Sequence, residues 1–280
     1  DTTDELIEKA REINPGASTR EMDMLLSTGE QISVALCAMA VEALGFPVVS
    51  LTGWQAGVVT NTVSMNARIK KVDTERIEAE LDARRIVIVT GFQGINRYDD
   101  VTTLGRGGSD TSAVALAASL HADLCQIYTD VDGVYTADPR LVPHARKLDE
   151  VTYNEMLELA TLGAQVLHNR SVEMAKKYNV SLEVLSSFSG NPGTKVKEVA
   201  KRMEKSYISS VAKDTNIARI ALLGVPNEIG TSFKVFSLLA QHNINVDIIL
   251  QGIGHEEGKD ICFTVAQSDL AMAEKLLREN

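Results

Sequence analysis

The sequence predicts an α/β fold in which helices cover both faces of a mostly parallel β-sheet, followed by a smaller α/β unit. Short β-branched runs such as residues 86–90 alternate with longer segments of helical periodicity, which indicates strands joined by crossover helices. From residue 217 onward the order is strand, helix, strand, strand, helix. A length of 280 residues with 44% hydrophobic content is sufficient for one large and one small domain.

The helices of the large domain are expected where apolar residues recur with the helical period. They comprise residues 4–13, 21–44, 74–83, 109–121, 152–161 and 168–178. The strands are short β-branched or apolar runs, and they comprise residues 46–51, 86–90, 124–129 and 181–187. Thr2 and Glu5 have the spacing of a capping box at the start of the first helix, and Gly45 follows the end of the second.

The domain boundaries follow from composition. Residues 1–195 form the large domain, and residues 196–214 are charged and weakly patterned, which is typical of a linker or of a solvated helix. Residues 215–280 form a βαββα unit, with a helix at 231–242, strands at 244–250 and 259–265, and a helix at 268–279. This unit is one strand short of a ferredoxin-like fold, so an exposed sheet edge is expected. Because the chain begins with a helix, we expect an opening strand outside the printed sequence.

Composition excludes several classes of partner. A net charge of −10 and a pI near 5.1 argue against nucleic acid, which needs basic surface. Cys37, Cys125 and Cys262 lie far apart in apolar patterns, which indicates buried reduced thiols and a cytoplasmic protein. No apolar run approaches the length of a membrane span, and the histidines lack the spacing of a metal site. We therefore expect neither a membrane partner nor a bound metal centre.

A glycine-rich run at residues 102–110 is the strongest sign of a ligand site. Its glycines allow close approach of the backbone, and Ser109 is placed to cap the helix that follows. Arg106 offers a planar fork suited to a carboxylate or phosphate. The alternative is a tight strand-to-helix turn without a ligand.

A second polar segment follows the strand at 124–129. Within residues 127–140, the loop after the strand holds three aspartates, a tyrosine and an arginine, at the strand's carboxyl end, where open α/β sheets bind ligands. Asp132 and Asp138 are interpreted as turn formers, because Asp-Gly and Asp-Pro pairs shape loops without touching ligands.

Together with Gly91-Phe92-Gln93-Gly94 and Ser27-Thr28-Gly29-Glu30, these segments resemble the aspartate kinases of the amino-acid kinase family over nearly the whole chain. The resemblance implies phosphorylation of the side-chain carboxylate of L-aspartate to 4-phospho-L-aspartate, with ATP and Mg²⁺, in lysine, threonine and methionine biosynthesis. Such a carboxylate is already ionised near neutral pH, so the protein has to supply position and charge rather than a base. The family's opening Lys-Phe-Gly-Gly phosphate loop is absent from the printed sequence, and we expect little turnover without it.

The resemblance also implies the site residues. The aspartate-binding residues would be Thr3, Glu30, Phe92, Arg106, Gly107, Gly108, Ser109 and Asp110. Arg106 would grip the α-carboxylate, while Glu30 and Asp110 would receive the ammonium group; a helix-surface carboxylate is the alternative for Glu30. The ATP-binding residues would be Thr129, Asp130, Tyr135, Arg140 and Gln165. Gln165 stands where relatives commonly have lysine, so it brings no charge to the phosphates.

The tail resembles an ACT domain, the amino-acid-sensing module of the same family. This implies control by threonine and/or lysine, and a homodimer or higher oligomer formed through paired ACT domains. The effector-binding residues would be Asn227, Gly230, Thr231, Ser232, Asn245, Val246, Asp247 and Gln251. A purely structural loop is the alternative.

Two other functions remain open at this stage. The chain would also suit a non-catalytic effector-binding or assembly subunit of the same enzyme. Another amino-acid kinase, such as one acting on acetylglutamate, is disfavoured by the helix carrying Glu30 and by the ACT-like tail.

Overall fold

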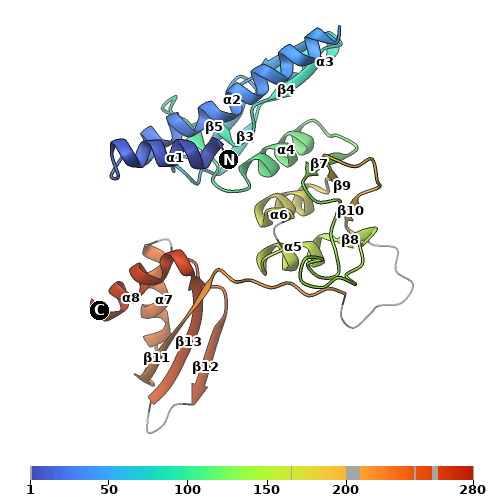
Figure 1. The fold of residues 1–280 in the computed structure, drawn as a ribbon. Helices are drawn as coiled ribbons and strands as arrows, with labels where there is room; N and C mark the ends of the chain where they lie inside the picture. Colours follow the sequence, from blue (N-terminus) through green and yellow to red (C-terminus); the bar gives the residue numbers. More distant parts are fainter. Residues whose placement is uncertain (1, 165, 200–208, 243, 254–257, 280) are drawn as a thin grey trace. The chain divides into compact units, whose positions relative to one another are not determined.

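The structure is a computed structural model that describes residues 2–164, 166–199, 209–242, 244–253 and 258–279. It divides into two compact units, Asp1–Ala212 and Lys213–Asn280 (Figure 1). The predicted α/β class is confirmed, and the smaller unit has the predicted βαββα order.

The helices of the larger unit lie close to their predicted positions. They are α1 (Thr2–Ile13), α2 (Thr19–Ala43), α3 (Glu75–Asp82), α4 (Gly108–Ser119), α5 (Tyr153–Thr161) and α6 (Asn169–Tyr178). Ser18 caps α2 by accepting a hydrogen bond from the main-chain N–H of Glu21, and Gly45 follows α2 with a φ of +83°. A capping box between Thr152 and Glu155 begins α5.

The strands of the larger unit form separate hydrogen-bonded sheets. They are β1 (Val48–Leu51), β2 (Val58–Thr60), β3 (Ile69–Val72), β4 (Ile86–Val89), β5 (Gln93–Ile95), β6 (Val101–Thr103), β7 (Cys125–Thr129), β8 (Glu150–Thr152), β9 (Leu182–Ser186) and β10 (Thr194–Lys197). β1 pairs in parallel with β4, and β7 pairs in parallel with β9 in the sheet β7-β9-β10-β8. A further sheet, β3-β2-β5-β6, contains antiparallel pairs that the sequence did not predict.

An apolar core joins helices α4, α5 and α6 to the sheet that contains β7 and β9. Val114, Met156, Val172 and Val184 are fully buried in it. Each side chain of this size contributes about 1.5–3 kcal/mol when it leaves water. The core therefore fixes α4, whose first turn carries the predicted ligand loop.

The smaller unit is a three-stranded antiparallel sheet with two helices on one face. Its elements are β11 (Ile217–Pro226), α7 (Thr231–Gln241), β12 (Ile249–Ile253), β13 (Gly258–Ala266), a 3₁₀ turn (Gln267–Asp269) and α8 (Leu270–Glu279), with strand order β11-β13-β12. Helices α7 and α8 lie on the same side of the sheet (Figure 1). Ile261, Phe263 and Val265 alternate along β13 and pack in one core with Leu239 of α7 and Leu276 of α8.

One strand of this unit begins later than predicted. The sequence predicted a strand over 244–250, but β12 starts at Ile249. Before that point the chain meets β13 through two main-chain bonds, Asp247 N to Thr264 O (3.1 Å) and Thr264 N to Ile248 O (3.0 Å). An apolar sequence pattern does not show where a continuous ladder begins.

Helix α2 corrects two expectations. By length and composition it is apolar enough to cross a membrane, so the prediction that no apolar run approaches that length was wrong. In the structure α2 packs on β1 and β6, and its buried Asp23 accepts hydrogen bonds from Met65 N (3.0 Å) and Thr103 Oγ1 (2.6 Å). The three cysteines are free thiols as predicted, but of the three only Cys125 is buried, because Cys37 of α2 is exposed and Cys262 is partly buried.

Candidate active site

The first turn of α4 and the loop before it have the backbone that the glycines predicted. Gly105 and Gly107 have φ values of +77° and +66°, and Gly107 occupies the N-cap position. The prediction that Ser109 caps the helix was wrong, because the cap is this left-handed glycine and Ser109 lies inside the first turn. The N–H groups of a first helical turn have no partner within the helix, and they give that end a partial positive charge.

The segment around Phe92 packs directly on the start of α4. A Cβ on Gly108 would lie 2.7 Å from Cδ2 of Phe92, and a Cβ on Gly91 would lie 3.3 Å from Cα of Ser109. Phe92 has a φ of +66°, a rare conformation for an aromatic residue. It is held by hydrogen bonds from its N–H to Ser112 Oγ (3.0 Å) and from Leu104 N to its carbonyl (2.9 Å). Such strain persists where surrounding contacts impose it, commonly at functional sites.

Helix α2, which carries Glu30, contacts the same region. Nε2 of Gln93, the residue after Phe92, donates to the carbonyl of Ser27 one turn before Glu30 (2.9 Å). The start of α1 lies on the same turn of α2, because a Cβ on Gly29 would stand 3.5 Å from Cγ2 of Thr2. Helix α2, which carries Glu30, thus contacts both the start of α1, where Thr3 lies, and the segment that carries Phe92.

Two carboxyl groups of this region are shielded from water. Burial raises the pKa of Glu30, and its Oε2 atom is buried with no hydrogen-bond partner among the described residues. Burial also raises the pKa of Asp110, against the opposing effect of the N–H of His168, which donates to Asp110 Oδ2 (3.4 Å). The pKa of Cys125 is raised to about 11 by burial and by the nearby Asp110 carboxylate. Within the described ranges neither carboxyl group forms a salt bridge that would compensate its burial, although the charge of His168 also acts to lower the pKa of Asp110.

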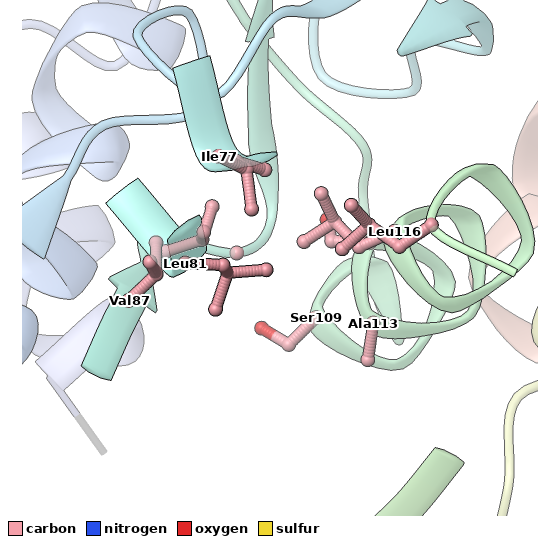
Figure 2. Close-up of a pocket in the computed structure, with 10 residues that line it drawn as sticks. Ile77, Leu81, Val87, Ser109, Ala113 and Leu116 are labelled. Carbon is pink, nitrogen blue, oxygen red and sulfur yellow. The ribbon is translucent and has the colours of Figure 1, made fainter. Parts of the chain in front are cut away.

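A cavity of about 400 Å³ opens beside Ser109, between α4 on one side and α3 with β4 on the other. Figure 2 shows Ser109, Ala113 and Leu116 facing Ile77 and Leu81 across it. Of the predicted aspartate-binding residues, only Ser109 lines this cavity, whose wall is otherwise mainly apolar. Arg106 is exposed on the loop between Gly105 and Gly107. The contacts therefore place Phe92, Gly108, Ser109 and Asp110 together and bring α2 against them, while Arg106 stands at the solvent side.

The loop after β7 is held by its own side chains. Thr129 Oγ1 donates to Asp130 Oδ1 (3.1 Å), and the Tyr135 hydroxyl donates to Asp132 Oδ1 (2.9 Å). The bond from Tyr135, then the charge of Lys147, keep the pKa of Asp132 below its ordinary value despite some burial.

Arg140 is engaged within the loop. Its Nη2 atom lies 2.9 Å from Oδ2 of Asp138, and its side chain is 86% exposed. Asp138 also accepts from the N–H of Arg140 (2.9 Å), the turn-forming role that the sequence indicated. Gln165, the remaining predicted ATP contact, lies outside the described residues.

The predicted effector residues of the smaller unit fall into two groups. Ser232, in the first turn of α7, accepts hydrogen bonds from Gln251 Nε2 (3.0 Å) and Lys259 Nζ (3.1 Å). Asn245 Nδ2 donates to Asp247 Oδ1 (2.8 Å) in the segment before β12. The others lie in the adjoining loops and first helical turn, and they are Asn227, Gly230, Thr231 and Val246.

Comparison with known proteins identifies the family. Residues 1–186 match the model of the amino acid kinase family, and residues 220–280 match that of the ACT domain. The chain belongs to the amino acid kinase family. It is 51% identical to the aspartokinase of Corynebacterium efficiens over 100% of the chain and 68% of the relative. With the aspartokinase of Geobacillus stearothermophilus the identity is 51% over 96% of the chain and 66% of the relative.

A solved structure of an aspartokinase supports the same family assignment. Aspartokinase III of E. coli, in complex with aspartate and ADP, matches with a TM-score of 0.77 and 31% identity, covering 94% of this chain and 59% of that one. The chain thus spans about two thirds of the curated relatives and 59% of this solved one.

Family membership directs attention to residues that sequence reasoning missed. Lys147 places its Nζ 3.4 Å from Asp132 Oδ2, beside Tyr135 in the predicted nucleotide loop. Gln93 has a buried Oε1 atom without a partner among the described residues, next to Phe92. The polar composition of the second segment was the available signal for Lys147, whereas the contact of Gln93 with α2 joins residues 66 positions apart and leaves no local pattern.

The residues present fit an Mg²⁺ site with few protein ligands. In the described part of the chain no group of three or more His, Cys, Asp or Glu side chains could hold a metal. Mg²⁺ that accompanies ATP is held by phosphate oxygens, waters and one or two carboxylates, so a dedicated protein cage is not required. Asp130, exposed at the end of β7, is a carboxylate within the predicted nucleotide loop.

Proposed function

We propose that the chain functions as an ATP-dependent aspartate kinase, converting L-aspartate to 4-phospho-L-aspartate with Mg²⁺ as the counterion of ATP. The proposal places the chemistry in residues 1–195 and amino-acid control in residues 215–280. The aspartokinase relatives support it, and so does the charge arrangement around α4.

The buried acceptor atom of Glu30 is the observation that carries the proposal. A carboxylate oxygen buried without a donor is costly, and a ligand ammonium group would supply the missing charge and hydrogen bonds. Asp110 offers a second shielded carboxyl on the turn that also carries Ser109. An α-amino acid brings such an ammonium group, whereas a simple dicarboxylate does not.

The other end of the ligand would meet donors. Arg106 has no ion pair among those found in the described residues, and its planar guanidinium suits the α-carboxylate of aspartate. Thr3 and Phe92 would flank the ligand, and Gly107 and Ser109 would present main-chain N–H groups to its negative groups. Gly108, whose N–H donates to the carbonyl of Gly105 (3.0 Å), would contribute the close approach that a residue without a side chain allows. The side-chain carboxylate is then the free nucleophile, and catalysis consists of holding it in line with the γ-phosphoryl group.

The loop after β7 would hold the nucleotide. Thr129 and Asp130 would contact the nucleoside, Tyr135 would lie near the base or ribose, and Arg140 near the phosphates. Arg140 would exchange its exposed pairing with Asp138 for a phosphate group, a low-cost exchange because surface ion pairs contribute about 0–1 kcal/mol. Gln165 would donate neutral hydrogen bonds there.

Regulation would occur in the smaller unit. Asn227, Gly230, Thr231, Ser232, Asn245, Val246, Asp247 and Gln251 would bind threonine and/or lysine. The exposed edges of β11 and β12 would favour pairing with a second copy, giving a homodimer or higher oligomer in the cytoplasm.

Calorimetric titration tests the proposal. Aspartate with Mg-ATP should give heat, and repetition in buffers of different ionisation enthalpy should reveal proton release, because a bound ammonium lowers the raised pKa values of Glu30 and Asp110. Aspartate affinity should accordingly fall at acidic pH. Glu30→Gln should abolish the proton release attributed to that site, and Glu42→Gln on the exposed side of α2 is the matched control.

The same titration distinguishes a kinase from a non-catalytic effector-binding subunit. Heat from threonine or lysine, with none from aspartate or Mg-ATP, would contradict the kinase proposal and indicate an effector-binding subunit.

A further inference from the structure

The start of α6 contacts the glycine-rich loop at both of its ends. Arg170 Nη1 donates to the carbonyl of Leu104 (2.6 Å), just before the loop. His168 N donates to Asp110 Oδ2 (3.4 Å), just after it. Between these two points lies Arg106 with its flanking glycines. One turn of a helix more than fifty residues later in the chain thus brackets the loop.

Arg170 also ties the loop to the segment before β3. Its Nη2 donates to the carbonyl of Ala67 (2.7 Å) and its Nη1 to Oδ1 of Asn66 (3.1 Å). That segment is fixed in turn, because Ala67 N donates to the carbonyl of Thr103 at the end of β6 (2.9 Å). The guanidinium is therefore a junction between α6 and two loops that have no sequence proximity to it.

The acceptors of Arg170 indicate what the side chain does. They are two main-chain carbonyls and one amide oxygen. The planar guanidinium therefore orients these neutral groups by hydrogen bonding and does not neutralise a negative charge. Burial lowers the pKa of this guanidinium, with the nearby Arg68 acting in the same direction. A half-buried cation with only neutral acceptors is a costly choice for packing alone.

His168 completes the support. A Cβ on Gly107 would stand 2.3 Å from both Cβ and Cγ of His168, so the loop backbone lies directly against this side chain. His168 itself is fixed as the cap of α6, since its Nδ1 accepts from the N–H of Arg170 (3.3 Å).

We propose that Arg170 is a positioning residue that sets the glycine-rich loop, and through it Arg106 and Asp110, in the geometry that binds aspartate. It acts on the loop main chain and does not touch the ligand. The ligand part rests on the proposed function, whereas the effect on the loop does not.

A lysine at position 170 distinguishes the effect of the hydrogen-bond geometry of arginine from the effect of its positive charge. Arg170→Lys keeps the positive charge but can satisfy only part of the acceptor set, and Arg170→Ala removes the group. Arg76→Lys is the matched control, because the exposed guanidinium of Arg76 pairs with the carboxylate of Glu80 in the same helix, α3.

The experiment has a readout that is independent of ligand binding. Trypsin cleavage after the exposed Arg106, followed by mass spectrometry on the folded chain, reports how firmly the loop is held. We expect cleavage to accelerate about tenfold in Arg170→Lys, as loss of charge-assisted hydrogen bonds implies, and further in Arg170→Ala. The control should cleave like wild type. Unchanged protection in Arg170→Lys would overturn the proposal.

Ligand affinities give the second readout. In Arg170→Lys the dissociation constant for aspartate should rise about 10- to 100-fold, as small misplacements of binding groups do, while that for Mg-ATP stays constant. Equal weakening of both ligands would indicate a general structural role and overturn the positioning role. If wild type binds no aspartate, the proposed function fails, yet the cleavage assay still decides whether Arg170 holds the loop. Asn66→Ala, which removes one acceptor, provides a milder variant should Arg170→Ala not fold.

Discussion

Gly107 is the position at which one added methyl group should most damage the site. Its φ is +66°, and a Cβ would stand 2.3 Å from Cβ of His168, in front of the α6 turn. The left-handed conformation costs an alanine about 1–2 kcal/mol. Inserting a methyl group into a closed contact adds about 1–3 kcal/mol. We therefore expect Gly107→Ala to lower the free energy of unfolding by about 2–5 kcal/mol and to weaken aspartate binding.

Urea denaturation of Gly107→Ala beside Gly45→Ala measures the two contributions separately. Gly45 has a similar φ of +83°, but no atom lies within 4 Å of the Cβ it would gain. Gly45→Ala should thus cost only the backbone strain of about 1–2 kcal/mol and leave aspartate binding unchanged. Equal losses in the two variants would refute the reasoning, because they would show that the His168 contact yields without cost.

Three further predictions concern residues around the site and its supports. Glu30→Gln should raise the free energy of unfolding near neutral pH while weakening aspartate binding. Burial raises the pKa of Glu30 in the folded chain, so the free energy of unfolding of the wild type falls as pH rises from the unfolded pKa of Glu30 through its folded pKa. The stability advantage of Glu30→Gln should therefore shrink when unfolding is measured at increasingly acidic pH. Thr103→Val should cost about 1–3 kcal/mol in urea, since it removes the 2.6 Å bond to the buried carboxylate of Asp23; a loss indistinguishable from zero would contradict this bond. Thr152→Ala should cost about 0.5–2 kcal/mol by removing one half of the capping box of α5, and hydrogen exchange should show faster opening of that helix end alone.

Local signals predicted the helices of the larger unit and the strands β1, β4, β7 and β9, whereas the parallel pair β8 and β10 was not predicted. Gly45 marks the end of α2 because a left-handed residue there satisfies the last turn. The β-branched run that becomes β4 was recognised by its composition and pairs in parallel with β1, although its residues are only partly buried and Ile86 is exposed. These features depend on residues within a few positions of one another.

The sheet β3-β2-β5-β6 could not be predicted in the same way. Its strands have three or four residues each, too few to show a two-residue period. β5 contains Gly94, whose missing Cβ allows close contact with Val58 of β2. Such a strand is defined by its neighbour rather than by its own sequence.

The candidate site likewise combines features that local sequence predicts with features that depend on contacts between distant residues. The glycine-rich loop was predictable because positive φ values require residues such as Gly107. Its cap was not, since Ser109 and Gly107 are both acceptable N-cap residues by type. The link from Arg170 to Leu104 spans 66 positions and depends on the packing of α6 against α4, which no local pattern records.

Discrimination between L-aspartate and succinate is the most direct test of the account. Succinate has both carboxylates but no ammonium group, so the acceptors on Glu30 and Asp110 would remain unpaired. Calorimetry should show aspartate binding at least about tenfold more tightly than succinate, the difference that one charge-assisted hydrogen bond provides, and Glu30→Gln should narrow the gap. Equal affinity of the wild-type chain for the two ligands would contradict the assignment of these carboxylates to the ammonium group.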